Sequence, residues 1–134
     1  MLRPFVILHK DLKMVVNVAL NQMVIIRYRE VNVEILLTLV RIGREEVELR
    51  VSRAHHVEMY RVPKAGEDPH LRLSDSDSVV VNEHQFIAAS CHGLSVHFFV
   101  ESRAGDQISM DIRLPTCMDF VVWDNGSVVQ TTGR

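Results

Sequence analysis

The feature that most constrains this chain is the alternation of apolar and polar residues over short, valine-rich stretches. Valine occurs 21 times in 134 residues, and β-branched side chains favour strands over helices. The clearest alternation lies at residues 47–51 (Val-Glu-Leu-Arg-Val), and residues 108–112 (Ile-Ser-Met-Asp-Ile) show it again. Successive side chains of a strand point to opposite faces of its sheet, so this period predicts strands with one buried face. We therefore expect an all-β fold.

Turn signals separate the expected strands. The segments 41–44 (Arg-Ile-Gly-Arg), 103–106 (Arg-Ala-Gly-Asp) and 124–126 (Asp-Asn-Gly) each lie between two apolar runs. Glycine and asparagine tolerate the positive φ angles that tight hairpin turns require. These three segments therefore predict three antiparallel hairpins.

Two segments favour short helical insertions between the strands. Residues 16–26 form a mixed apolar stretch long enough for one or two amphipathic turns. In residues 82–91, Asn82 is a good helix N-cap and Gln85 follows at the third helical position, with Gly93 as a stop. We expect a short helix in each segment.

Composition places the chain among compact proteins without a membrane span. A chain of this length buries roughly two-thirds of its unfolded surface, which is enough for a core without disulfides. The first apolar run is soon interrupted by Lys10, Asp11 and Lys13, so it predicts neither a signal peptide nor a membrane segment. Cys91 and Cys117 match no disulfide framework or zinc spacing. The expected location is the cytoplasm.

The distribution of charge and a linker that contains proline and glycine divide the chain into two halves. Residues 1–66 carry 11 Lys and Arg against 7 Asp and Glu, whereas residues 67–134 carry 4 against 10. A linker at residues 63–70, with two prolines and a glycine, lies at the change of sign. We therefore expect units at 1–62 and 71–134, with any polyanion site on the first. Alternatively, the charges of each half only keep its surface soluble and form no binding site.

The two halves share a pattern of apolar positions. After a glycine, three apolar residues at alternate positions are followed by a five-residue gap and two more apolar residues. In the first half these are Gly43, Val47, Leu49, Val51, Val57 and Met59; in the second they are Gly105, Ile108, Met110, Ile112, Met118 and Phe120. The pattern predicts a tandem repeat, although two unrelated β-hairpins of similar length would also look alike.

The repeat unit resembles the carbon storage regulator (CsrA/RsmA) family of small RNA-binding translational regulators. Val40-Arg41-Ile42-Gly43 corresponds to the family's V-R-I-G turn, and Val57-Glu58-Met59-Tyr60-Arg61 to its last strand. Residues 105–115 resemble the same turn and strand in the second half. The resemblance implies five-stranded units whose antiparallel strands interleave as sheets or a barrel. Two tandem units would form a pseudo-dimer within one chain, and a homodimer is the alternative.

The resemblance also implies a function and the residues that carry it. Family members recognise a GGA element in an RNA hairpin loop and block translation. Carried over, Arg61 contacts guanine or phosphate, Tyr60 stacks on a base, and backbone groups at Val57 and Met59 bind the edge. His9 and Lys10 on the first strand, and Arg44 in the turn, complete the predicted RNA site. The expected partner is a messenger or small regulatory RNA, with a protein regulator as another candidate.

Other chemistry has weaker support in the sequence. His55 and His56 are adjacent, so a regular strand points them to opposite faces and they cannot share a metal ion. There is no glycine-rich phosphate loop in the sequence. We therefore expect no metal, no cofactor and no catalysis. The alternative function is a β-sandwich or barrel that acts as a protein-interaction or structural module without RNA binding.

Overall fold

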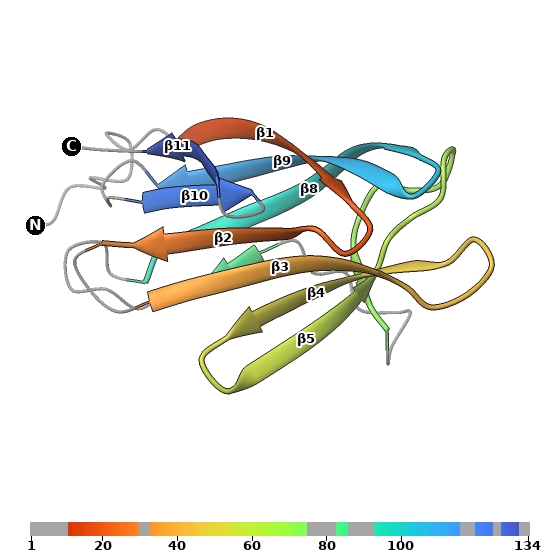
Figure 1. Ribbon diagram of the computed structural model, residues 1–134, viewed down its shortest axis with the longest axis horizontal. Helices are drawn as coiled ribbons and strands as arrows, with labels where there is room; N and C mark the ends of the chain where they lie inside the picture. Colours follow the sequence, from red (N-terminus) through yellow and green to blue (C-terminus); the bar gives the residue numbers. More distant parts are fainter. Residues whose placement is uncertain are drawn as a thin grey trace, which may run out of the picture.

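The computed structural model describes residues 11–29, 33–74, 83–85, 93–115, 120–124 and 127–131 (Figure 1). These residues form eleven β-strands and no helix, which confirms the all-β prediction. Consequently no helix in this part of the chain is of a length and hydropathy to cross a membrane. The strands are β1 (Asp11–Ala19), β2 (Met23–Tyr28), β3 (Val33–Arg41), β4 (Val47–Arg53), β5 (His56–Arg61), β6 (Arg72–Leu73), β7 (Glu83–Gln85), β8 (Ser95–Ala104), β9 (Gln107–Pro115), β10 (Phe120–Asp124) and β11 (Ser127–Thr131).

The strands form two antiparallel sheets. The smaller sheet has the order β1-β9-β8-β7, and the larger has the order β11-β10-β2-β3-β4-β5-β6. The two sheets are separate and open, so they do not form the closed barrel that was one of the expected architectures. β1 and β2 belong to different sheets although only residues 20–22 separate them, so the chain turns a corner there.

The predicted hairpins are confirmed, but the alternation holds only in part, because Glu48 in β4 and Asp111 in β9 are also buried. β3 pairs with β4, β8 with β9, and β10 with β11. In β4, Val47, Leu49 and Val51 are buried whereas Arg50 is exposed. Gly105 has a φ of 61° at the first position of the two-residue β8–β9 turn, as a type II′ hairpin requires.

The prediction of a helix at residues 16–26 is wrong. This segment contains the end of β1, a turn and the start of β2. Val16 and Val18 are buried while Val15 and Asn17 are exposed, so burial follows the period of a strand. Asn21, with a φ of 64°, supplies the turn. Of the second predicted helix, residues 83–85 form β7 instead, and residues 86–91 lie outside the described residues.

One hydrophobic core lies between the sheets and draws on both halves of the chain. Buried side chains from β1, β8 and β9 on one side belong to the same cluster as those from β2 to β5 and β10 on the other. β1 pairs with β9 along nine positions, and β10 pairs with β2 along five. The first half therefore contributes β1 to the smaller sheet, and the second half contributes β6, β10 and β11 to the larger one.

The strands that follow the β3–β4 and β8–β9 hairpins differ between the two halves. β5 continues from β4 and pairs with it, whereas β10 leaves β9 and pairs with β2 in the other sheet. The segment 63–70 between the halves contains no strand, and most of it is exposed. The common pattern of apolar positions thus describes the β3–β4 and β8–β9 hairpins but not the strand that follows each.

Candidate nucleic-acid interface

The predicted RNA-binding residues of β5 lie on two different faces. Val57, Met59 and Arg61 are exposed on the outer face of the larger sheet. Tyr60 points the other way, into the core, and only 1% of its surface is exposed. The ring faces of Tyr60 are therefore covered, and base stacking would require it to leave the core. His9 and Lys10 lie outside the described residues.

The remaining predicted residue, Arg44, lies where the β3–β4 turn meets the β8–β9 turn. Both turns project toward the same end of the molecule, although more than fifty residues separate them in the sequence (Figure 1). Arg41 at the end of β3 forms an ion pair with Asp106, across the gap between the sheets. Arg103 near the end of β8 donates from Nη2 to the carbonyl oxygen of Glu45 in the opposite turn. The two turns are thus fastened to each other.

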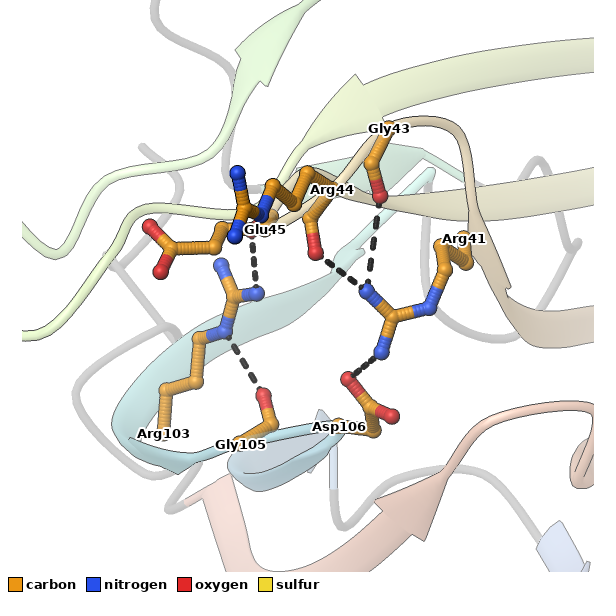
Figure 2. A network of polar contacts seen from close by, with 7 residues as sticks. All are labelled: Arg41, Gly43, Arg44, Glu45, Arg103, Gly105 and Asp106. Carbon is orange, nitrogen blue, oxygen red and sulfur yellow. Dashed lines mark hydrogen bonds and ion pairs between the residues drawn. The ribbon is translucent and has the colours of Figure 1, made fainter.

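The arginines of the two turns make similar local contacts. Each lies two residues before a glycine and donates to the carbonyl oxygen of that glycine, Arg41 to Gly43 and Arg103 to Gly105 (Figure 2). Each guanidinium then uses another nitrogen to reach the opposite turn.

A cleft of about 430 Å³ opens at the junction of the two turns. Arg44, Lys64 and Arg103 line it together with Arg41, so four cationic side chains border one space. Glu45 and Asp106 are the carboxylates that also line it, and Asp106 is already paired with Arg41. Figure 2 shows the guanidinium groups of Arg44 and Arg103 on the same side of the junction. The residual charge of this cleft is positive.

Three of the four cations of this junction, Arg44, Lys64 and Arg103, form no ion pair with the described residues. Among these residues, the side chains of Arg44 and Lys64 have no ion-pair partner, and Arg103 donates only to carbonyl oxygens. The Nη1 atom of Arg103 is buried and has no hydrogen-bond partner in the same part of the chain. A buried donor of this kind costs free energy until an acceptor satisfies it.

Most of this junction was not predicted from the sequence. Both turns and Arg44 were predicted, but the RNA site was expected along β5, and Arg41, Lys64 and Arg103 had no predicted role. The shared Arg-x-Gly spacing would have pointed to Arg41 and Arg103, whereas no sequence signal points to Lys64. Spacing alone, however, does not reveal that the two turns touch.

A second titratable cluster lies at the opposite end of β4. The Tyr60 hydroxyl donates a hydrogen bond to Oε2 of Glu58, and the same hydroxyl oxygen lies 3.0 Å from Nε2 of His84 on β7. His56 lies 3.1 Å from the other carboxylate oxygen of Glu58. Burial is the largest influence on Glu58, but hydrogen bonds from Tyr60 and His56 and the nearby His84 outweigh it and lower the Glu58 pKa. Burial and the bond to Glu58 raise the pKa of Tyr60.

Comparison of the chain with models of known protein families, with curated proteins and with solved structures finds no match.

Proposed function

We propose that this chain binds RNA and that the cleft between the two hairpin turns holds the phosphate backbone. Arginine is suited to this role because its planar fork of N–H donors matches the oxygens of a phosphate. The proposal is supported by the resemblance of residues 38–61 to RNA-binding translational regulators and by the cations that line the cleft. Recognition of a GGA hairpin loop, and hence translational control, is the finer form of the same proposal.

The observation that carries the proposal is the group of cations that line the cleft without a carboxylate partner. Among the described residues, Arg44, Lys64 and Arg103 line the cleft and form no ion pair. The carbonyl oxygens of Gly105 and Glu45 hold the guanidinium of Arg103 in place. A preorganised cation is what a phosphate site needs.

Charge sets the expected strength of binding. The chain carries a net charge of −2, and Glu45 and Asp106 border the cleft. Only a few phosphates can therefore be neutralised at once, and affinity should fall steadily as salt is added. This behaviour differs from that of a strongly basic protein, which binds nucleic acid with a steep salt dependence.

An electrophoretic mobility-shift titration with an RNA hairpin that carries GGA in its loop tests the proposal. We expect a complex at low salt that weakens as salt is raised. Arg44→Ala should weaken binding and reduce the slope of log affinity against log salt by about 1, as loss of one phosphate contact does. Arg27→Ala is the matched control because Arg27 is engaged with Glu34 and Trp123, away from the cleft.

Two outcomes of the titration would refute the proposal. One is the absence of a complex between the intact chain and the hairpin at low salt. The other is an Arg44→Ala effect no larger than that of Arg27→Ala. A hairpin with a scrambled loop separates the finer claim, because equal affinity for both loops would leave phosphate binding in place and remove GGA recognition.

A second candidate function is a protein-interaction module, and the outer face of the larger sheet favours it. Val57, Met59 and Met23 are 52%, 41% and 38% exposed there. Strand register places Met59 beside Arg50 and places Val57 in one row with Ser52, Leu36 and Ile25. Sedimentation equilibrium tests whether a second copy covers this face. We expect self-association that Met59→Asp abolishes, whereas a monomer at all concentrations would exclude a homodimer.

A further inference from the structure

The cleft between the two hairpin turns contains a carboxylate that phosphate binding does not explain. Glu45 lines this cleft, and its carboxylate forms no hydrogen bond or ion pair with any described residue. The other lining carboxylate, that of Asp106, is paired with Arg41, as Figure 2 shows. A carboxylate repels phosphate, so a cleft that held only the backbone of RNA would gain nothing from Glu45.

Hydrogen bonds hold the backbone of the β3–β4 turn in place around Glu45. The carbonyl oxygen of Glu45 accepts a hydrogen bond from Nη2 of Arg103, and the carbonyl oxygen of the preceding residue accepts one of 2.6 Å from Nη1 of Arg41. Two further backbone N–H groups of the turn donate to the carbonyl oxygen of Glu46, at 2.9 and 3.2 Å. The carboxylate of Glu45 is therefore presented to the cleft from an anchored backbone.

The chemistry of a carboxylate selects one RNA base. An ionised carboxylate only accepts hydrogen bonds, and its two oxygens can accept two parallel bonds side by side. Guanine has two adjacent donors, N1–H and N2–H, on its Watson–Crick edge. Adenine and cytosine have one amino group beside an acceptor nitrogen, and uracil has one N–H between two carbonyl oxygens. Guanine therefore matches both oxygens of a carboxylate, whereas each other base brings an acceptor that the carboxylate repels.

The same edge sets the state of the RNA. The Watson–Crick edge of guanine is occupied in a duplex, and bases are exposed for reading on this edge in single-stranded loops. The cleft has a volume of about 430 Å³, within the range of clefts that hold small ligands. A carboxylate at this position therefore fits an unpaired guanine rather than a base-paired one.

We propose that Glu45 recognises an unpaired guanine in the cleft while Arg44, Lys64 and Arg103 hold a phosphate of the same strand. This inference rests on the proposed RNA binding and names the base and the residue that selects it. Glu45 acts in two ways, because it pairs with guanine and repels a strand whose bases cannot satisfy its charge. Specificity of this kind combines an attractive contact with a repulsive one.

Mobility-shift titrations of the intact chain with three RNA hairpins test the proposal. The hairpins have the same stem and carry guanine, inosine or adenine at the same loop positions, and inosine differs from guanosine only in lacking the N2 amino group. We expect the guanine loop to bind about tenfold more tightly than the adenine loop, the discrimination expected of one bidentate contact. The inosine loop should lie between them, because it retains only the N1–H donor.

Glu45→Gln isolates the carboxylate. The amide replaces one acceptor by a donor and removes the charge, so we expect the three loops to bind with nearly equal affinity. The adenine loop should bind at least as tightly as it does to the intact chain, an effect that general damage to the turn would not produce. Glu46→Gln is the matched control, because it removes the same charge from the same turn at a side chain that lies against Gly43 and does not line the cleft. It should keep the full preference for guanine.

The outcomes separate this inference from the proposed function. Equal affinity of the intact chain for the guanine and adenine loops would overturn guanine recognition and leave phosphate binding in place. A preference for guanine that survives in Glu45→Gln, or that is lost to the same extent in Glu46→Gln, would also overturn the role of Glu45 alone. The absence of a complex with all three hairpins at low salt would refute RNA binding itself, and guanine recognition with it.

Discussion

At the scale of single residues, Tyr60 decides the orientation of β5. Alternation read from the sequence groups Val57 with Met59 as the apolar face and leaves Glu58 on the polar one. The structure reverses this arrangement because Tyr60, opposite Leu49 on β4, is buried in the core. A period of two then forces Glu58 inward and Val57 and Met59 outward. The burial of Tyr60 explains both its hydrogen bonds with Glu58 and His84 and the exposure of Val57 and Met59. The pattern of apolar residues alone could reveal neither.

The pH dependence of stability is the prediction that belongs to this scale. His84 has a pKa below its usual 6.5 because burial disfavours the charged ring. The unfolded chain therefore binds more protons than the folded chain, so folding stability is fully present above about pH 6.5 and declines as pH falls below it. Glu58 does not act in this window, because a lowered carboxylate pKa costs stability only below about pH 4.5.

Urea denaturation at pH 7.5 and pH 5.5 checks this expectation. The intact chain should lose unfolding free energy between the two values, and His84→Gln should lose clearly less. At pH 7.5 the variant itself should be less stable by about 1–3 kcal/mol, because the ring contacts are lost. His55→Gln replaces an exposed histidine of the β4–β5 turn and serves as the matched substitution control. A variant at position 84 with an undiminished slope would show that another group titrates.

At the scale of elements, local signals predicted the hairpins and failed where the chain changes sheets. Glycines in the turns and a period of two were sufficient for β3–β4 and β8–β9. The segment 16–26 failed because its valines were read as part of an amphipathic helix, whereas Asn21 turns the chain from one sheet into the other. The candidate site was only partly predictable for the same reason. Both turns were visible in the sequence, but the contact between Arg41 and Asp106 is a property of tertiary packing.

The β8–β9 turn offers a prediction at this scale. Gly105 has a φ of 61°, and a Cβ placed there would meet nothing within 4 Å, so the cost of a side chain is purely a backbone cost. Gly105→Ala should destabilise the fold by about 1 kcal/mol. Gly105→Asn should cost less, because asparagine tolerates positive φ. Urea midpoints of the three proteins measure the order, and an alanine variant as stable as the parent would contradict the turn geometry.

At the scale of the whole molecule, each sheet contains strands from both halves of the chain. The prolines and glycine of residues 63–70, together with the change in charge there, predicted two units. The common pattern of apolar positions predicted that these units are interleaved copies of one another. Which strand pairs with which could not be read from either, because pairing between β1 and β9 joins segments about ninety residues apart. The core likewise mixes side chains from both halves. Interleaving of this kind implies that neither half buries its apolar surface alone.

Separation of the halves is therefore the sharpest global prediction. A cut within the exposed segment 63–70 gives fragments 1–66 and 67–134, which leave nine ladder positions of β1 and five of β2 without partners. Unpaired strands with an exposed apolar face are not independently stable. Each fragment alone should lack a cooperative unfolding transition by circular dichroism, whereas mixing them should restore it in a one-to-one complex. The matched control is the intact chain, which should unfold in a single step because one core holds both sheets. If fragment 1–66 folded by itself, β2 to β5 would form an autonomous sheet, and the strands exchanged between the halves would be dispensable to it.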